Sequence, residues 1–600
     1  MCSMPAKAGG KKENMNQFKK IMAQSHMQNK EGLHQLYTDR QIYISSISSS
    51  QQPVEDEKIF FYREVSFSFA GTGFRTPEKV VLYVWIPGKL VNYEKGMIRE
   101  RIPCEDWLLR TLSKPINDLP GTWQNDHKDA REKSIFSMQK VSPAVRRRNG
   151  CLYMEQQEAF RIRIVFRFPL INGHSVNGKS GYKDLRLLMD TICDNLETAK
   201  KEELQAHVQL YKKQWEIREY LNKRNLLAFV GNGSILPRQG DTWEPMCGAV
   251  PFQSPPQLEI VIPLSDGTII RGMGIKKGIT IITGGGYSGK STLLNALEQG
   301  IYFHIAGDGR EYVIVEETAC KIYAEDGRVV YDTDISPFFS YIPGQNNRHE
   351  FSTPHASGSL SQAANVVEAV YGGSRLLLID EDTSATNFMI RDRLMRQLVR
   401  KESIIPYTDR IRELKEQDVS TILIIGGSSE YLKYGDCILL LEDYRAYDRT
   451  EETKKLLCSE EIPNQMFLAG SVLADDYKWM KYRSLPQKLC VEELSYGQSI
   501  RIDNGRFICL GRITADIARL TALEDEGQIS TLAWLLEQLL LHSWQEGEDL
   551  NSCCRQLTQN LFEDSVDVIL ASRSHAYELW LEEVRSLDLL MAAGRLRRSE

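Results

Sequence analysis

The chain has 600 residues, of which 42% are apolar, 26% charged and 9% aromatic. This composition is typical of a globular protein of several domains and excludes wholesale disorder, coiled-coil fibres and collagen-like fibres. The formal net charge of −6 excludes a polycation, so any nucleic-acid binding has to come from a local basic patch. The scattered cysteines lack zinc-site spacing and indicate a reducing compartment, and no apolar run is long enough to predict a membrane span.

The first half of the chain predicts an arm followed by an α+β domain. Residues 1–55 are polar and rich in Gln, Ser and Lys, which favours a flexible N-terminal arm. Val80–Ile86 is β-branched and aromatic and predicts a buried strand. Phe160–Phe168 alternates with a period of two, so one face of this strand packs and the other faces solvent or a ligand. Asp184–Leu221 predicts a long amphipathic helix, and we expect the N-terminal domain to span residues 56–245.

The alternating strand is also basic. Arginines that alternate along a strand near an aromatic residue could follow a phosphate backbone while the ring stacks on bases. A solvated sheet face with a charged loop explains the same pattern, and both interpretations stay open. The predicted nucleic-acid-binding residues are Arg146, Arg147, Arg148, Arg161, Arg163 and Arg167.

Strands and helices then alternate over residues 246–455, which predicts a mostly parallel α/β core. Asp-Gly-Arg turns at Asp308 and Asp326 separate short strands, so we expect an antiparallel β-subdomain inserted in this core. Residues 456–600 contain a hairpin-like stretch, Ile500–Leu510, and then apolar helical patterns. They predict a mostly helical C-terminal domain.

A glycine-rich segment follows the apolar strand Ile279–Thr283 and precedes a predicted helix. It fits the pattern G-x-x-x-x-G-K-[ST], in which backbone N–H groups converge on a phosphate at a helix N-terminus. We expect Lys290 to reach the β- and γ-phosphates of ATP and Ser291 to ligate Mg²⁺. The predicted nucleotide-binding residues here are Gly284, Gly285, Gly286, Tyr287, Ser288, Gly289, Lys290, Ser291 and Thr292.

A second apolar run, Leu376–Ile379, ends in Asp380 and Glu381. A buried strand that delivers a carboxylate at its C-terminal end is how phosphate-loop enzymes place the acid that orients Mg²⁺, here Asp380. Glu381 is then positioned to polarise the attacking water, so Glu381 and Lys290 are the predicted catalytic residues. A solvated acid pair at a strand end is the alternative.

A serine-glycine-serine turn opens the helix upstream of the acidic strand. It consists of Ser357, Gly358 and Ser359, and such a turn can bind phosphate or simply cap the helix. Its spacing from the acid pair favours a second phosphate cradle, as in ABC proteins. Gln345 is a further candidate nucleotide contact, in the place of a Q-loop.

These segments resemble the family described as predicted ATPases of the ABC class. The residues that carry the resemblance are LLAFVGNGSILPR, GMGIKKGITIITGGGYSGKSTLLNALE, GDGRE, SGSLSQAANVVEA, LLLIDEDTSATNFMIRD and ILIIGGSSEY. The resemblance implies an ABC-type nucleotide-binding fold between extra N- and C-terminal domains, with ATP and Mg²⁺ as cofactors. One kinetoplastid mitochondrial member is associated with RNA editing, which implies RNA, an RNA-processing complex and the mitochondrial matrix; otherwise a soluble cytoplasmic protein is expected.

The sequence departs from ordinary ABC enzymes at two positions. Gly426-Gly427-Ser428-Ser429 stands where a histidine usually contacts the γ-phosphate, and Asp382 replaces the usual proline after Glu381. Hydrolysis is therefore expected to be slow or to be completed by another residue. Since only one motif set occurs, a complete pair of sites requires a homodimer. The alternative is an ATP-gated clamp or scaffold on DNA or a protein complex, with little or no hydrolysis.

Overall fold

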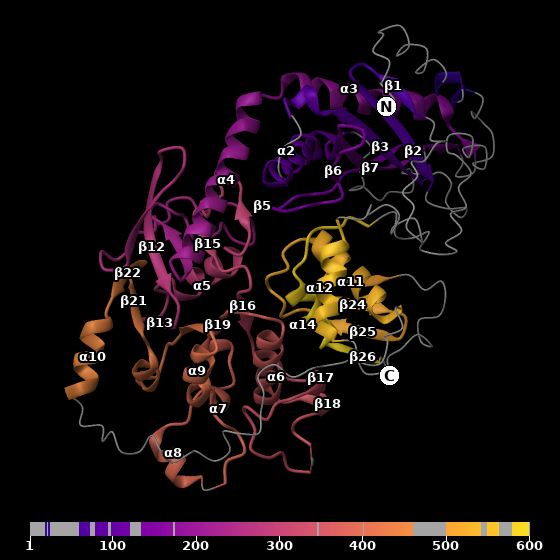
Figure 1. Cartoon of the computed structure of the whole chain (residues 1–600). Helices are drawn as coiled ribbons and strands as arrows, with labels where there is room; N and C mark the ends of the chain where they lie inside the picture. The colour runs from indigo at the N-terminus through magenta and orange to yellow at the C-terminus, as the bar shows by residue number, and fades with distance from the viewer. Residues whose placement is uncertain are drawn as a thin grey trace. The chain divides into compact units, whose positions relative to one another are not determined.

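The computed structural model describes residues 18–20, 22–23, 59–71, 79–93, 98–119, 134–171, 175–344, 347–399, 401–459, 500–541, 549–562 and 579–598. Its contacts divide the chain into two compact units (Figure 1). The first takes the described residues up to Leu210, Asp525–Thr531 and those within Asn560–Glu583; the second takes the remainder. The domain limits expected at residues 245/246 and 455/456 fall inside the second unit and stay predictions.

An antiparallel sheet forms the first unit, in the strand order β1-β2-β3-β7-β4, with β6 also paired to β7. Its strands are β1 (Phe60–Tyr62), β2 (Val65–Gly71), β3 (Lys79–Pro87), β4 (Ile135–Ser137), β6 (Cys151–Met154) and β7 (Ala159–Arg167). The predicted strands Val80–Ile86 and Phe160–Phe168 correspond to β3 and β7, which pair along their full length. The unit also contains β5 (Ala144–Val145), the 3-10 helix η2 (Gly88–Val91) and the pair β8 (Leu170–Ile171) and β9 (Ser175–Val176).

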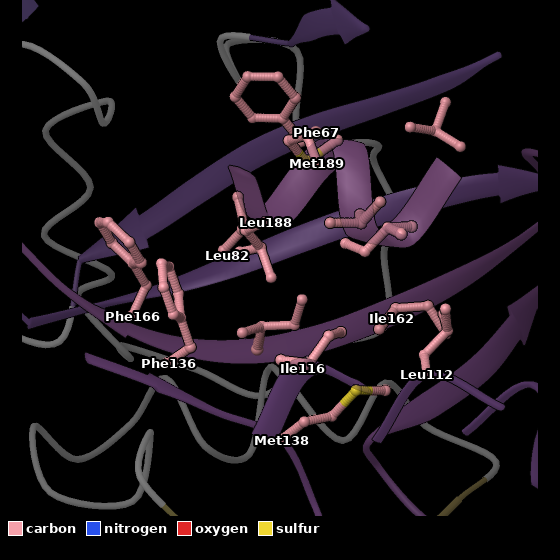
Figure 2. Packing of buried hydrophobic residues seen from close by; sticks show 14 of the residues in the cluster. Phe67, Leu82, Leu112, Ile116, Phe136, Met138, Ile162, Phe166, Leu188 and Met189 are labelled. Carbon is pink, nitrogen blue, oxygen red and sulfur yellow. The ribbon is translucent and has the colours of Figure 1, made fainter. Parts of the chain in front are cut away.

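The alternating side chains of β3 and β7 make the core of this unit. Phe160, Ile162, Ile164 and Phe166 are fully buried, which confirms the predicted packed face. Helices α2 (Ile98–Asn117) and α3 (Gly178–Thr198) contribute to the same cluster. Figure 2 shows Leu112 and Ile116 of α2 and Leu188 and Met189 of α3 among the sheet side chains. Phe18, from the expected flexible arm, is also fully buried in this core, with its ring 5.7 Å from that of Phe67.

The expected single helix over Asp184–Leu221 is two helices, which corrects the prediction. Helix α3 ends at Thr198, and α4 spans Lys201–Lys223. Ala199 has extended backbone angles (φ −61°, ψ 127°), so the helical hydrogen bonds are interrupted there. The amphipathic period continues across the break, which is why the pattern alone did not reveal it.

A mostly parallel sheet forms the centre of the second unit, in the order β16-β19-β20-β13-β21-β22. Its strands are β13 (Ile279–Gly284), β16 (Cys320–Ile322), β19 (Leu376–Asp380), β20 (Ser420–Ile424), β21 (Cys437–Glu442) and β22 (Arg445–Asp448). All neighbours pair in parallel except the hairpin β21–β22. One strand, β20, therefore separates the strand before the phosphate loop from the strand that ends in the acid pair.

Helices of the second unit connect or follow these strands. They are α5 (Lys290–Gln299), α6 (Gly358–Tyr371), α7 (Thr386–Met389), α8 (Arg393–Leu398), α9 (Tyr407–Glu416), α10 (Thr450–Ser459), α12 (Leu550–Asn560), α14 (Ser586–Ala593) and the 3-10 helices η4 (Glu381–Thr383) and η5 (Ser429–Tyr434). Helix α11 (Glu526–Leu541) begins in the first unit and continues in the second. Of the helices in the described part of the chain, none is long and apolar enough to cross a bilayer.

Three smaller antiparallel sheets lie among the described residues of the second unit. They are β11-β12-β10-β15, with β10 (Leu226–Gly231), β11 (Glu259–Pro263), β12 (Ile269–Lys276) and β15 (Val313–Val315); β17-β18 (Arg328–Thr333, Phe351–Ala356); and β23-β24-β25-β26 (Arg501–Asp503, Phe507–Leu510, Ile513–Asp516, Leu596–Arg598). The pairing of β23 with β24 confirms the hairpin expected within Ile500–Leu510.

The strands around the Asp-Gly-Arg turns do not form one inserted subdomain, contrary to the expectation. Strand β15 joins β10, β16 is the edge of the central parallel sheet, and β17 pairs with β18. The partners of β15 and β16 lie far away in sequence and β17 pairs with the strand that follows it, so the turns between these three strands could not identify their partners.

Candidate functional site

The glycine-rich loop begins where β13 leaves the central sheet. Gly284 has φ +151°, and a Cβ atom there would lie 2.2 Å from the carbonyl oxygen of Leu441, so only glycine fits. Lys290 Nζ donates hydrogen bonds to the carbonyl oxygens of Gly284 (2.8 Å) and Gly285 (2.7 Å). The buried Ser288 hydroxyl has no hydrogen-bond partner among the described residues. The loop thus encloses the lysine amine, with its backbone exposed at Gly285 and open for an anion.

The predicted metal-binding residues come together at the edge of the sheet. The Ser291 hydroxyl lies 3.4 Å from Asp380 Oδ2, although the two residues follow different strands. Asp380 Oδ1 accepts a hydrogen bond from the backbone N–H of Asp382 (3.1 Å). Burial raises the pKa of Asp380, so a cation would restore its charged form. A hydroxyl and a carboxylate are oxygen donors of the kind that Mg²⁺ prefers, and Ser291 and Asp380 therefore fit this ion.

Glu381 follows Asp380 at the start of η4 and lies against the loop that follows β20. Its Oε2 atom accepts hydrogen bonds from the backbone N–H groups of Gly426 (2.7 Å) and Gly427 (3.2 Å). The same loop is fixed to the strand before the phosphate loop, because the N–H of Ile425 donates to the carbonyl of Ile282 (2.9 Å). The segment that lacks the usual histidine therefore contacts the predicted base through its backbone.

The serine-glycine-serine turn opens α6 as predicted. Ser357 is the exposed residue before the helix, and no side-chain hydrogen bond caps the first turn. One turn further on, the buried amide of Gln362 accepts from the N–H of Ala385 (2.8 Å) and donates to the Ser384 hydroxyl (2.9 Å). This side chain ties the helix to the segment that follows the acid pair.

Two buried arginines hold the other side of α6. Arg328 of β17 donates to Asn365 Oδ1 (2.6 Å) and forms a short ion pair with Glu368. Arg595 donates to the same Asn365 oxygen (2.9 Å) and to Glu325 Oε1 (2.6 Å). Because each charge has a partner, this network can persist in an apolar environment. Residues distant in sequence thus fix the helix that carries the predicted second cradle.

The basic patch predicted for nucleic acid is largely buried, and this corrects the sequence interpretation. Arg146, Arg148, Arg161 and Arg163 are 1–8% exposed. Arg148 pairs with Asp106 (2.6 Å) and Glu582 (3.3 Å), and Arg146 pairs with Asp525 and Glu582. Burial raises the pKa of Asp525, but Arg146, Arg148 and the hydrogen bonds with Ser142 and Glu582 together bring it below its usual value, which favours the charged form.

Aromatic rings of the same unit contact several arginines of the patch. The guanidinium of Arg163 lies 4.6 Å from the ring centre of Trp580, and that of Arg161 lies 4.8 Å from the ring centre of Tyr83. Arg147 is half-buried and donates to the carbonyl of Phe562 (2.9 Å). These aromatic rings belong to the same compact unit, so they satisfy the arginines within it. Arg167 is half-buried as well.

Motif analysis missed Gln362, the Gly426–Gly427 contact and Tyr444. Tyr444 is 59% exposed on the β21–β22 turn, and a Cβ atom added to Gly289 would lie 3.4 Å from its ring. The parallel pairing of Gly284 with Leu441 brings this turn to the phosphate loop. No local pattern announces such a pairing. Gln345, the candidate Q-loop residue, lies outside the described residues.

The comparisons with known proteins agree with this geometry. Residues 200–470 match the model of the ABC_ATPase family, described as a P-loop domain. We call this matched segment, which covers less than half of the chain, the ABC_ATPase domain. A P-loop domain is one whose glycine-rich loop binds the phosphates of a nucleotide.

One relative of the ABC_ATPase domain is the uncharacterized protein MJ1628 of Methanocaldococcus jannaschii. The two are 33% identical over 241 residues, which are 38% of this chain and 53% of that protein. The chain therefore spans about half the length of this relative.

Solved structures of ABC transporter subunits align with a similar share of the chain. MJ1267, an ATP-binding cassette of an ABC transporter in its ADP conformation, aligns with 40% of this chain and 96% of its own at 15% identity and a TM-score of 0.24. cbiO1 from Clostridium perfringens is part of the ABC transporter complex cbiONQ. It aligns with 39% of this chain and 94% of its own, at 13% identity and a TM-score of 0.24. These alignments carry no argument about the fold. The ABC-type P-loop fold of this segment is supported by the family match and by its own parallel sheet.

Proposed function

We propose that the protein binds Mg-ATP and hydrolyses it slowly between two protomers of a homodimer, and that closure of the dimer is coupled to RNA binding or remodelling. The observation that supports the ATPase part best is the approach of Ser291 to Asp380, 3.4 Å apart, beside the amine of Lys290. This arrangement unites the groups that bind phosphate and its metal ion at one edge of a sheet.

Each of the four candidate site residues has a defined part in the proposed reaction. Lys290 binds the β- and γ-phosphates, and Ser291 and Asp380 would hold Mg²⁺, which neutralises charge on the phosphate oxygens. Glu381 accepts a proton from the attacking water while the oxygen of that water bonds to the γ-phosphorus. The bond from that phosphorus to the bridging oxygen breaks, and ADP leaves with the bridging oxygen. The proton on Glu381 then passes to solvent.

The homodimer follows from the incomplete site of one chain. The segments that resemble the ABC class include one lysine-bearing loop, Gly284–Ser291, and one serine-glycine-serine turn, Ser357–Ser359. Ser357 is exposed at the free N-terminus of α6, where backbone N–H groups can receive the γ-phosphate bound by a second copy. A two-fold axis then completes two identical sites, with Lys290 of one copy facing Ser357–Ser359 of the other.

RNA as the partner, an RNA-processing complex and a mitochondrial location rest on the family resemblance. Four of the six predicted arginines are buried, which removes these four from the argument for an RNA-binding surface. A filter-binding titration of single-stranded RNA, with duplex DNA as competitor, tests this part. Affinity for neither nucleic acid, with and without ATP, would refute it.

A second candidate is an ATP-gated clamp or scaffold on DNA or a protein complex, with little hydrolysis. The absence of the usual histidine at Gly426–Ser429 favours it. In this case ATP closes the dimer and its dissociation opens it, so phosphate release is not needed for each cycle.

A phosphate-release assay separates the two functions. Glu381→Gln should lower the steady-state rate at least about a hundredfold and leave ATP affinity within about twofold, because it removes the base but none of the phosphate contacts. With ATP, this variant should accumulate as a dimer in light scattering after size exclusion. Glu416→Gln, an exposed acid at the end of α9, is the matched control. Equal background rates for wild type and Glu381→Gln would refute hydrolysis and favour the clamp.

A further inference from the structure

The loop after β20, where the sequence lacks the usual histidine, contacts Glu381 through its backbone. It lies between two functional strands, because β20 pairs with β19 on one side and β13 on the other. The register sets Asp380 beside Ile424, so Glu381 lies next to the loop that begins at Ile425. The two segments are therefore neighbours by the topology of the sheet.

Both contacts of this loop with Glu381 use backbone N–H groups and one carboxylate oxygen. Gly426 and Gly427 donate to Oε2 at 2.7 and 3.2 Å. A carboxylate has two oxygens, so Oε1 is left to accept a proton from water. Hydrogen bonds to a charged acceptor are stronger than those between neutral groups, and two from adjacent residues fix the carboxylate plane.

The donors are themselves held by the core. The backbone before them is bonded to β13 through Ile425 and Ile282. After them, Ser428 accepts from the N–H of Glu430 (3.3 Å) and starts η5. Tyr431 of η5 is 1% exposed in the core, and burial and the nearby Glu381 carboxylate raise its pKa. A loop anchored on both sides presents its N–H groups in a fixed direction.

We propose that the backbone N–H groups of Gly426 and Gly427 hold Glu381 in position to accept the proton of the attacking water. They are positioning residues that act through Glu381, in the place where other ABC enzymes use a histidine side chain. The inference rests on the proposed ATPase function.

Substitution of Gly426 by proline or by alanine distinguishes the role of its backbone N–H group from a requirement for glycine at this position. Gly426 has no atom within 4 Å of an added Cβ and is not among the residues with positive φ, so Gly426→Ala keeps the backbone and the donor. Gly426→Pro removes the donor. We expect proline to lower kcat at least about tenfold with KM for Mg-ATP within about twofold, and alanine to restore kcat. Equal kcat values for the two variants, both with wild-type ATP affinity, would refute the inference.

Hydrogen exchange measures the same contact without turnover. In the full-length protein without nucleotide, Glu381→Ala should speed exchange of the Gly426 and Gly427 amide protons about tenfold, whereas Glu381→Gln keeps an oxygen that accepts from them. Unchanged exchange in Glu381→Ala would refute the contact. A wild-type chain without phosphate release, but with the expected exchange difference, would instead refute the proposed hydrolysis and leave the contact between loop and carboxylate intact. Gly427→Pro provides a second donor deletion if Gly426→Pro fails to fold.

Discussion

Substitution of Arg148 tests whether the arginines form an exposed nucleic-acid-binding surface or a buried network of ion pairs. Its side chain is 1% exposed and pairs with Asp106 at 2.6 Å and Glu582 at 3.3 Å. The side chains of these two acids are 0% and 1% exposed, so Arg148→Ala leaves carboxylates without this charge in an interior where water cannot replace it. Breaking a buried ion pair by removing one partner costs about 3 to 5 kcal/mol. For a unit of this size, that corresponds to a fall in melting temperature of about 10 °C.

Thermal unfolding of the full-length chain, followed by tryptophan fluorescence and circular dichroism, tests this value. Lys140→Ala is the matched control, because Lys140 is an exposed cation in the same unit and its loss should change stability by less than about 0.5 kcal/mol. RNA affinity of the variant is measured well below its melting temperature. If Arg148→Ala is as stable as the control but loses RNA affinity, the buried network is wrong and the arginine faces a ligand.

Two more substitutions test the phosphate site and the core of the first unit. Lys290→Ala should weaken ATP binding about a hundredfold in calorimetry, because the amine sits inside the phosphate loop at 2.8 Å from Gly284 O; unchanged affinity would contradict its predicted role. Burial raises the pKa of Glu105 from 4.5 to about 7, so the folded chain keeps a proton that the unfolded chain releases near 4.5. Stability should therefore fall as pH rises between about 5 and 7, by at most roughly 3 kcal/mol, and Glu105→Gln should flatten this part of the profile of melting temperature against pH. The same slope in both proteins would contradict the assignment.

The phosphate loop and the acid pair could be predicted because their residues are contiguous. Gly284 to Ser291 contains its own strand exit, turn and helix start, and Asp380 marks the end of an apolar strand. The meeting of Ser291 with Asp380 at 3.4 Å then followed from the usual architecture of phosphate-loop enzymes. Local chemistry and local geometry agree in these segments.

The buried arginines show where such prediction ends. A period of two establishes that Arg161 and Arg163 share one face of β7, but it contains no information about what covers that face. Trp580, which lies against Arg163, and Asp525 and Glu582, which pair with Arg146, all follow hundreds of residues later in the chain. The contact of Gly426 with Glu381 was hidden for the same reason, because it depends on strand order in the sheet.

Arg595 links the folding of the second unit to the order in which the chain is synthesised. This residue bonds Asn365 and Glu325, and β26 beside it pairs with β25. The phosphate loop and α6 are synthesised before residues 584–598. During translation they lack this support until those residues leave the ribosome. Since domains fold as they emerge, the second unit should reach protease resistance late in translation, and ATP should protect stalled chains that include Arg595 better than shorter ones.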